Sequence, residues 1–594
     1  MPGGYMGKVL FVNLSKGKIK TESLEEKMCR DFIGGYGLGA RILYSRQQAK
    51  VKALAGENIL GFLTGPLTGT PAPTGARYVV VAKSPLTGTW GDANSGGEFG
   101  PYLKFAGCDA VFFTSISEKP IYLLIDNGKA ELKDAAHLWG KDTYETEDIL
   151  EDEYGAESRV SCIGPSGEKL SLISCIINRR GCAAGRSGLG AVMGSKKLKA
   201  VVARGNQPVA VADKQAVDSL REKYMAKLGP IRGTLHKYGT ASHAAISAQN
   251  GDSPVKNWGG IGVVDFPDVS GLEPEAVVAN LDKHIGCWHC PIACEAYLKE
   301  GTSEYRYAAG SRRPEYETLA SFGAMCLNNN TESIAKANDI CNRYGIDTIS
   351  AGCTIAFAIE CYENGLITKK DTGGIELAWG NHRAIVDMTE NMARREGFGN
   401  VLADGVKLAA ERIGRGADKY AVHIGGQELG MHDPKLMPPM VGDVESASAR
   451  YQMAATPGRH TQGFGPSSFM AHALSSAGLC YFGGMWGQLK DFLNAVTGFD
   501  YSRDELSKAG DRIATLRHAF NLREGINPLQ WTVHPRIIGQ PPQESGPLAG
   551  VTADLTGQID DNLAALDWDR ATTVPSQKKL KYLSLDDVAG DLWP

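Results

Sequence analysis

Three cysteines lie close together in the chain and have the spacing of metal ligands. Residues 287–294, CWHCPIAC, place Cys287, Cys290 and Cys294 in the pattern C-x2-C-x3-C. This pattern can gather three thiolates around one small volume, which suits an iron–sulfur cluster. Structural zinc more often takes two close pairs of ligands, and the chain has no second C-x2-C pair. We predict a [4Fe–4S] cluster. Zinc, or three reduced thiols at a helix–loop corner, are the alternatives.

A cluster held by three nearby cysteines needs a fourth ligand from elsewhere in the chain. The sequence has 13 cysteines, and the ten outside this run show no spacing typical of a disulfide framework. This usage favours a reducing compartment, so we expect a cytoplasmic protein. A protein with such a cluster transfers electrons.

Composition gives no indication of a nucleic-acid or membrane partner. The 594 residues carry a net charge of −4, and 22% of them are charged. No apolar run approaches 18 residues, so we expect no membrane span. The first residues show no basic region followed by an apolar stretch, and we therefore expect no export signal.

Glycine-rich segments are the second feature that points to chemistry. The chain has 72 glycines, and two dense segments, residues 65–97 and 181–194, contain Arg77 and Arg186 respectively. Backbone N–H groups together with a guanidinium are suited to a buried phosphate. Neither segment is a Walker loop, because the Gly-Lys-Ser/Thr sequence is absent. An ordinary turn beside a surface arginine is the alternative reading.

The elements that must position these residues change in type along the chain. Residues 1–208 contain short apolar runs, such as residues 78–81 and 110–113, which predict β-strands. Beyond residue 213 the periodicity becomes helical. The clearest predicted helix covers residues 331–347, with Thr331 as a possible N-cap and Gly345 as the left-handed C-terminal residue.

Two later loops share a short pattern. Residues 342–347 and 475–480 each have a polar residue, two spacers, glycine, an aliphatic residue and then a potential ligand, Asp347 or Cys480. Two similar loops suggest a ligand with two similar halves. Chance is the alternative, because glycine commonly follows a helix.

Together these segments resemble the tungsten-dependent aldehyde:ferredoxin oxidoreductase family. The resemblance rests on the cysteine run, on PEYET at residues 314–318, and on GPLTG, PTGAR, KSPLTGT and NSGG within residues 65–97. It implies an α+β fold in which an N-terminal domain of two β-sheets precedes two mainly α-helical domains. We place these domains at residues 1–208, 209–415 and 416–594.

The resemblance also implies the cofactors. These are tungsten, with molybdenum as a possibility, between two pterin dithiolenes, a [4Fe–4S] cluster, and Mg²⁺ bridging the pterin phosphates. The family pattern makes Cys480 the fourth cluster ligand beside Cys287, Cys290 and Cys294. The residues that it places at the pterins are Arg77, Asn94, Gly96, Ala183, Gly185, Arg186, Asn342, Ile346, Asp347, Ser475 and Leu479.

The implied reaction oxidises an aldehyde to a carboxylic acid with water and passes two electrons through the cluster to ferredoxin or a ferredoxin-like subunit. Glu317 matches the family's active-site glutamate and is the expected general base. His460 matches a histidine near the metal and is expected to orient the substrate. The plainer alternatives are a helix cap for Glu317 and a structural or solvent-exposed role for His460.

The chain departs from the family pattern in ways that keep other functions open. Asn342 and Ser475 replace the leading aspartates of the two pterin loops, and residues 335–338, AKAN, lack an E-x-x-H pair that binds an iron between subunits in some members. We therefore expect no bridging iron, in a homo- or hetero-oligomer. One alternative is a tungsten enzyme of the same fold, such as a reductase acting on an aromatic acyl thioester in a larger complex. Another is an electron-carrying subunit without a catalytic metal.

Overall fold

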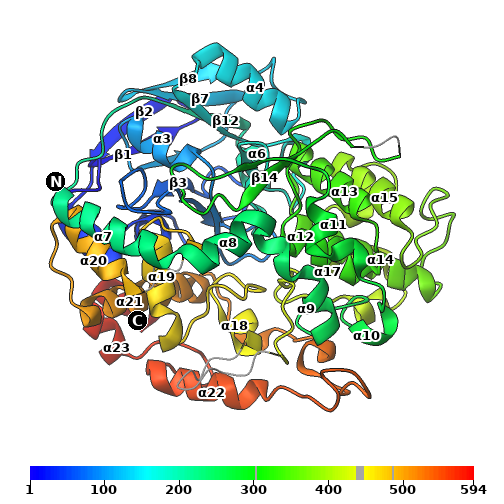
Figure 1. The fold of residues 1–594 in the computed structure, drawn as a ribbon. Coiled ribbons are helices and arrows are strands. Elements are labelled where there is room, and N and C mark those ends of the chain that lie inside the picture. The colour runs from blue at the N-terminus through cyan, green and yellow to red at the C-terminus, as the bar shows by residue number, and fades with distance from the viewer. Residues whose placement is uncertain (302–303, 437–446, 484–486, 594) are drawn as a thin grey trace.

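The computed structural model describes residues 1–301, 304–436, 447–483 and 487–593. Within these ranges, the first 204 residues contain two six-stranded sheets, and helices dominate the remainder (Figure 1). This arrangement confirms the predicted fold class. The last strand of the N-terminal region ends at Arg204 and the next helix, α7 (Lys214–Lys227), begins at Lys214. The three domain limits themselves stay a prediction.

The first sheet has the order β2-β1-β6-β3-β4-β5 and is antiparallel except where β1 pairs with β6. The interior strand β4 is buried on both faces, so its sequence YVVVAK is almost continuously apolar. Val79 and Val81 face the helical side, whereas Val80 faces the second sheet. The strands are β1 (Lys8–Asn13), β2 (Lys18–Ser23), β3 (Leu60–Thr64), β4 (Tyr78–Lys83), β5 (Trp90–Ser95) and β6 (Ala110–Thr114).

The second sheet has the order β11-β10-β9-β12-β7-β8. It shares one apolar core with the first sheet, in which Phe62 and Val80 pack with Leu123 and Val201. Its short edge strand β11 contacts the edge strand β5 of the first sheet. The strands are β7 (Ile121–Asp126), β8 (Lys129–Asp134), β9 (Ser158–Cys162), β10 (Ile176–Asn178), β11 (Cys182–Ala184) and β12 (Leu198–Arg204).

A helical region after residue 213 forms a second core (Figure 1). Its central helices are α12 (Tyr316–Phe322), α13 (Thr331–Tyr344), α14 (Thr348–Glu363), α15 (His382–Arg394) and α17 (Val406–Ile413). The predicted helix at residues 331–347 is thus α13, and Gly345 follows it with φ +70°. Thr331 is not its N-cap. The side chain of Asn330 accepts the Ser333 N–H instead.

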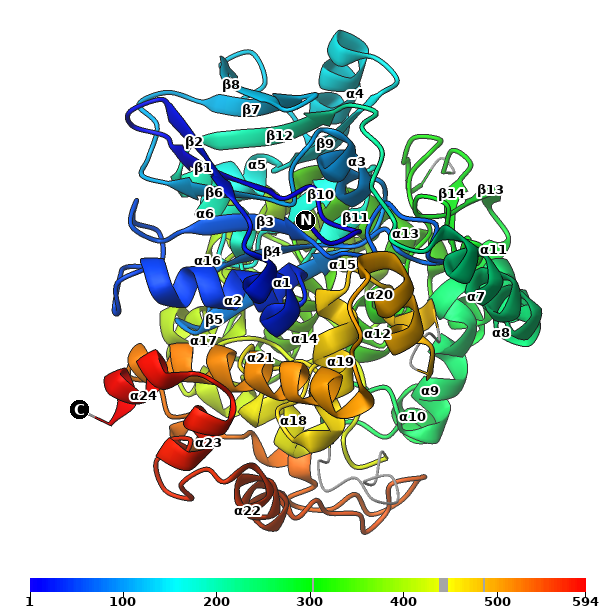
Figure 2. The same cartoon turned by 90° about the vertical axis from the view of Figure 1, so that its left-hand side faces the viewer.

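The C-terminal helices cover the outer face of the first sheet. Figure 2 shows α21 (Arg503–Arg523) and α19 (Phe469–Ser476) beneath the N-terminal strands, and both contact α2 (Gly35–Arg46). Leu38 of α2 and Leu516 of α21 lie in the same apolar core as Val81 of β4. Other helices of this part are α18 (Ala447–Met453), α20 (Leu489–Thr497) and α22 (Leu555–Leu566). Among the described residues, no helix combines the length and apolarity needed to cross a membrane.

Candidate active site

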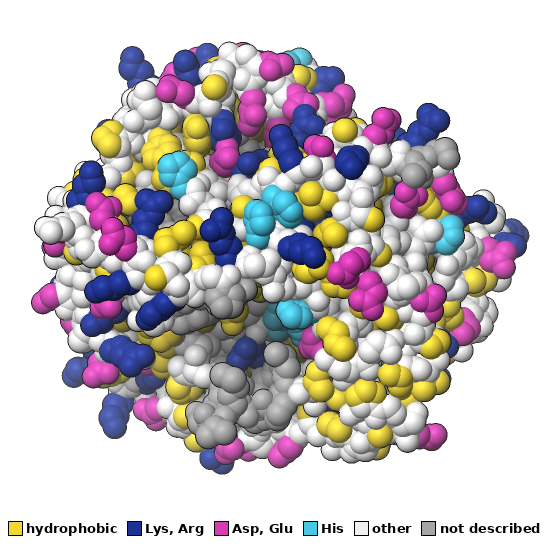
Figure 3. Space-filling view, viewed as in Figure 1, with side chains coloured by type: hydrophobic (Ala, Val, Ile, Leu, Met, Phe, Trp, Pro, Cys, Tyr) yellow, Lys and Arg dark blue, Asp and Glu magenta, His cyan; other side chains and the backbone are white. Residues whose placement is uncertain are grey.

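A cavity of about 830 Å³ lies where the N-terminal strands meet the helical regions. Segments from all parts of the chain form its walls, among them the ends of β5 and β11, the cysteine run and the start of α12. The space-filling view shows that this face of the molecule is hollowed (Figure 3). All four predicted cluster cysteines and both predicted catalytic residues line the cavity.

The cysteine run forms the turn of a short hairpin between β13 (Leu281–Ile285) and β14 (Glu295–Leu298). His289 and Ala293 have φ +47° and +48°, so the chain bends tightly enough for all three thiols to border one cavity. Cys480 comes from the loop after α19 and borders the same space. None of the 13 cysteines forms a disulfide.

This set of thiols fits an iron–sulfur cluster. The Gly97 N–H lies 3.2 Å from the Cys287 sulfur, and Arg77 Nη2 lies 3.4 Å from the Cys480 sulfur, so the sulfurs already have donors that suit thiolates. Burial raises the pKa of Cys287 and of Cys294 well above the usual thiol value. These thiols stay protonated unless a cationic partner such as iron replaces the protons. A second C-x2-C pair that would favour structural zinc is absent from the sequence.

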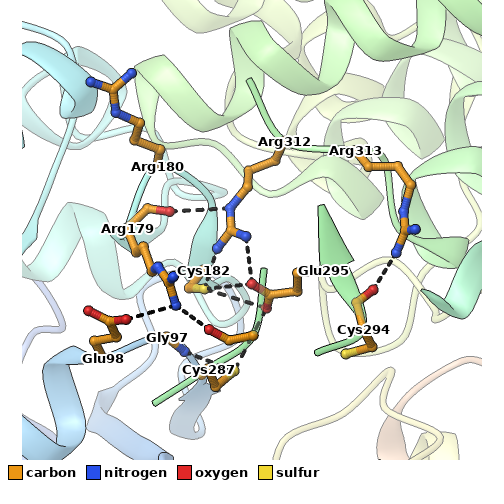
Figure 4. Close-up of polar contacts among 12 residues, drawn as sticks. Gly97, Glu98, Arg179, Arg180, Cys182, Cys287, Cys294, Glu295, Arg312 and Arg313 are labelled. Carbon is orange, nitrogen blue, oxygen red and sulfur yellow. Dashed lines mark hydrogen bonds and ion pairs between the residues drawn. The ribbon is translucent and has the colours of Figure 1, made fainter. Parts of the chain in front are cut away.

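A charged network lies directly behind Cys287 (Figure 4). Arg312 pairs with Glu295 at 2.6 Å and donates to the sulfur of Cys182 at 2.8 Å. Glu295 in turn lies 3.9 Å from the sulfur of Cys287. Burial opposes ionisation of Glu295, but the Arg312 guanidinium holds its pKa below the usual value. A fixed ion pair therefore borders the predicted cluster.

The predicted catalytic pair is brought together. Glu317 lies in the first turn of α12, and its Oε1 is 3.7 Å from Nε2 of His460, which lies in the loop after α18. Its Oε2 accepts the Met431 N–H at 2.9 Å. Its carboxylate does not cap α12, since the N-cap position belongs to Glu315. The helix-cap reading of Glu317 is therefore not supported, and its role as the general base stays a prediction.

The surroundings shift the pKa values of Glu317 and His460 in opposite directions. Enclosure in the cavity wall raises the pKa of Glu317 above the usual carboxyl value. The same enclosure, together with nearby His432 and Arg450, lowers the pKa of His460 well below 6.5. At neutral pH His460 is therefore an uncharged imidazole, and Glu317 has the raised basicity that suits a general base.

Nine of the eleven residues expected at the pterins line the cavity. These are Arg77, Asn94, Gly96, Ala183, Gly185, Arg186, Asn342, Ile346 and Asp347. Ser475 lies in α19 and Leu479 is packed in the apolar core, so neither is part of the cavity wall. The binding roles of all eleven stay predictions.

Arg186 and two glycines shape the part of the cavity wall where the pterins are expected. Arg186 donates to the Glu428 and Gly458 carbonyls at 2.7 and 3.1 Å and pairs with Asp347 at 3.1 Å. A Cβ on Gly96 would meet the Cys287 sulfur at 2.8 Å, so only glycine lets this loop approach the cysteine run. A Cβ on Gly185 would meet only Ala183 within 4 Å, so backbone here is open to a ligand.

Several cavity residues have no counterpart among the residues singled out from the sequence. The structure adds Asp252, His432, Arg312, Glu295 and Arg459 to the wall. His432 contacts Asp252 across 180 positions of sequence, a pairing that no local pattern indicates. Arg459 directly precedes His460, and this adjacency was the one sequence signal that could have placed Arg459 at the cavity.

Comparisons with known proteins cover almost the whole chain. Residues 9–205 match the family described as aldehyde ferredoxin oxidoreductase, N-terminal domain, and residues 215–585 match its domains 2 and 3. The chain is 36% identical to the tungsten-containing aldehyde ferredoxin oxidoreductase of Pyrococcus abyssi, over 98% of this chain and 99% of the relative. It is 30% identical to the aliphatic sulfonate oxidoreductase, WOR-like subunit, of Pyrococcus furiosus, over 98% and 97% of the two chains.

Among solved structures, the chain is similar to the active site complex BamBC of benzoyl coenzyme A reductase in complex with 1,5-dienoyl-CoA. The TM-score is 0.84 at 23% identity, and the match covers 100% of this chain and 98% of the other. At this identity the likeness supports the fold alone.

Proposed function

Because this chain belongs to the aldehyde ferredoxin oxidoreductase family, we propose that it oxidises an aldehyde to a carboxylic acid with water. Two electrons pass through a [4Fe–4S] cluster to ferredoxin or a ferredoxin-like subunit. One observation carries the proposal: four thiols, two of them bound by Gly97 and Arg77, and the Glu317–His460 pair border the same cavity. An electron-carrying subunit without a catalytic metal has no need of that pair.

The cofactors of the proposal are a tungsten bis-pterin, with molybdenum possible, a cluster on the four cysteines, and Mg²⁺ at the pterin phosphates. Arg77, Asn94, Ala183, Arg186 and Asp347 are the residues that would hold the pterins. When bound, the tungsten supplies Lewis-acid polarisation of the substrate oxygen and accepts the two electrons.

The residues of the chain supply the proton chemistry and the positioning. Glu317 takes a proton from water or from the aldehyde hydrate, because its raised pKa makes the carboxylate a stronger base than an exposed one. The neutral His460 can donate one hydrogen bond to the substrate oxygen. The apolar side chains of Leu235 and Ile292 line the same cavity and help to exclude water.

The proposed electron path leaves through the cysteine hairpin. Arg77 contacts Cys480 and lies near Cys287, so it links the two sources of cluster ligands. Cys287 and Cys290 also line a second hollow at the surface, together with Trp288 and His289. This is the face at which an electron-accepting subunit or ferredoxin would bind.

Metal analysis of the purified protein, combined with an aldehyde panel, tests the proposal. We expect about four iron atoms per chain, on the stoichiometry of a [4Fe–4S] cluster. We also expect tungsten or molybdenum, and reduction of a low-potential acceptor that depends on an aldehyde. Stoichiometric zinc without visible absorbance would contradict the cluster. Full metal content with no activity on any aldehyde would contradict the reaction.

A second candidate is a reductase of aromatic acyl thioesters. Asn342 and Ser475 replace two aspartates of the family pattern, and this change permits an altered cofactor environment. The same assay, run with an aryl acyl thioester and a low-potential electron donor, distinguishes the two. Turnover of the thioester together with inactivity on aldehydes favours this candidate.

A further inference from the structure

A second histidine in the cavity has no part in the reaction described so far. One nitrogen each of His432 and His460 and one oxygen of Glu317 all lie within 4.8 Å of one another. The His432 ring stacks on Tyr316, with centroids 4.7 Å apart and planes at 17°. Its Nε2 lies 4.0 Å from Oε1 of Glu317. His432 thus lies beside Glu317, the expected base, and is held there by its packing on Tyr316.

The other nitrogen of His432 is held by a carboxylate. Nδ1 lies 3.0 and 3.1 Å from the two oxygens of Asp252. Asp252 also accepts the hydroxyls of Ser247 at 2.9 Å and of Tyr316 at 3.3 Å. Because Nδ1 donates its proton to Asp252, the neutral ring presents an unprotonated Nε2 toward Glu317.

His432 and His460 therefore differ in basicity. Burial lowers the pKa of His432, but its hydrogen bond to the Asp252 carboxylate and the charge of Glu317 outweigh burial, so that the pKa is raised above 6.5. The pKa of His460 is instead well below 6.5. Two titratable groups whose surroundings separate their pKa values commonly have different roles in proton transfer.

Other charged groups around His432 do not change this assignment. His460 lies with its ring centroid 4.6 Å away, and Tyr451 donates its hydroxyl to the His432 carbonyl at 2.8 Å rather than to the ring. Asp433, the next residue, is paired with Lys435 at 2.8 Å. Arg186 acts on Glu317 but is paired with Asp347. Among the described residues, Asp252 and Glu317 are thus the carboxylates that interact with the His432 ring.

Helix α9 (Ala244–Asn250) borders the cavity beside Asp252. Asp252 accepts a hydrogen bond from Ser247 of α9, and Ile246 of the same helix is 57% exposed while still lining the cavity. The side chains of His432 and Glu317 are each 25% exposed, and both line the same cavity. A proton that reaches His432 has a short way to water.

We propose that His432, held by Asp252, accepts the proton from Glu317 after each oxidation and releases it to water in the outer part of the cavity. This inference rests on the proposed function. Oxidation of an aldehyde with one water yields a carboxylic acid, two protons and two electrons, and the electrons leave to the ferredoxin-type acceptor. Glu317 gains one of these protons. Before Glu317 acts again, its carboxyl O–H proton passes to Nε2 of His432, across a gap that a side-chain rotation or one water closes. The imidazolium then loses that proton to water.

Loss of the relay should affect the first turnover and later turnovers differently. In the holoenzyme of H432Q, we expect the iron and tungsten contents of wild type and a single reduction of the enzyme by aldehyde within about threefold of the wild-type rate. Steady-state kcat should fall by roughly tenfold or more, with KM little changed, because removal of a proton-transfer group commonly costs 10²-fold or more. Added imidazole should restore part of kcat. H137Q, which alters an exposed histidine in the N-terminal domain, is the matched control.

D252N tests the relay without removing the ring. Loss of the Asp252 charge lowers the pKa of His432, so the acidic limb of the kcat profile should move to lower pH by about one unit. The pH dependence of His432 modification by diethyl pyrocarbonate, followed by peptide mass spectrometry of the holoenzyme, should show the same shift. This second readout does not depend on turnover.

The outcomes separate the two proposals. A wild-type enzyme with full metal content and no aldehyde oxidation refutes the proposed function and the relay together. An active wild type combined with an H432Q enzyme of normal steady-state kcat refutes the relay alone. Equal loss of the first turnover and of later turnovers, without rescue by imidazole, also refutes it, because that pattern indicates damage to the site. If H432Q does not fold, an unshifted pH profile in D252N overturns the relay.

Discussion

Opposite pKa shifts on neighbouring side chains are the main chemical property of the cavity. Glu317 is made more basic than an ordinary carboxylate, while His460 is kept neutral, although their nearest atoms are 3.7 Å apart. Both side chains lie in the wall of the cavity, which encloses them. The same enclosure disfavours every uncompensated charge and so produces both shifts.

Replacement of Glu317 by glutamine tests its role as the base. E317Q keeps the size of the side chain and can still accept the Met431 N–H through its amide oxygen. We expect both metals to be retained and kcat to fall by roughly 10²-fold or more. Metal analysis and steady-state rates are the measurements, and the exposed E273Q is the control. Near-normal turnover of E317Q would remove Glu317 from the mechanism.

Arg312 provides a test of the electrostatics behind the cysteine hairpin. In R312M, Glu295 loses its partner at 2.6 Å but remains 3.9 Å from the Cys287 sulfur. Loss of Arg312 also raises the pKa of Glu295, so the prediction applies at alkaline pH, where Glu295 stays ionised. There the unbalanced negative charge disfavours the reduced cluster, and the midpoint potential should fall by tens of millivolts. A redox titration followed by electron paramagnetic resonance measures it. R383M, which breaks an exposed pair with Glu304, should leave the potential unchanged.

At the scale of elements, local patterns predicted what local chemistry determines. The apolar run of β4 and the glycine after α13 could both be predicted from the sequence. Burial on two faces requires apolar residues, and a positive φ favours glycine. The N-cap of α13 was assigned to Thr331 rather than Asn330, since both residue types can cap. The β13–β14 hairpin was not predicted, because LDKHI is too polar to indicate a strand.

The left-handed glycine of the first pterin-type loop allows a matched test. Gly345 and Gly365 have φ +70° and +71°, but a Cβ on Gly345 would meet the Gly164 nitrogen at 3.0 Å, whereas a Cβ on Gly365 would meet nothing within 4 Å. Both alanine variants should lose about 1 kcal/mol of stability from the backbone conformation.

G345A should lose more, because it must also displace the loop between Asn342 and Asp347. Thermal unfolding midpoints and cofactor content of G345A and G365A are the comparison. Equal midpoints for the two variants would show that the contact with Gly164 relaxes at no cost.

At the scale of the whole molecule, pairs that are distant in sequence join separate regions of the chain. Asp252 and His432 are 180 positions apart, and Asp92 and Arg517 are 425 apart. The family resemblance could place the cysteines, Glu317 and His460, because each lies in a short motif. It could not place Asp252 or Arg312, whose functions arise only when separate regions pack together.

The Asp92–Arg517 pair joins the N-terminal sheet to the C-terminal helices and predicts how the molecule responds to acid. Asp92 of β5 and Arg517 of α21 are essentially unexposed and 2.6 Å apart, and Gln462 donates to the second carboxylate oxygen. Burial raises the pKa of Asp92, but Arg517 and Arg459 outweigh it and lower the pKa to about 2. Because the pKa of Asp92 is lowered, its ionised carboxylate stabilises the fold at pH values above the unfolded-state pKa near 3.9. This contribution is lost as the pH falls toward 2.

D92N should therefore destabilise the protein at neutral pH by about 3–5 kcal/mol, since Arg517 stays buried without its partner and the new amide faces the Gln462 amide. The same variant should lose less additional stability than wild type between pH 4 and pH 2. Urea unfolding midpoints at pH 7, 4 and 2.5 measure both effects. The double variant D92L/R517M should regain part of the loss at pH 7, because it removes both buried charges together. If the double variant is less stable than D92N, the unpaired charge of Arg517 is not the cause of the stability lost in D92N. The ion pair itself then stabilises the junction.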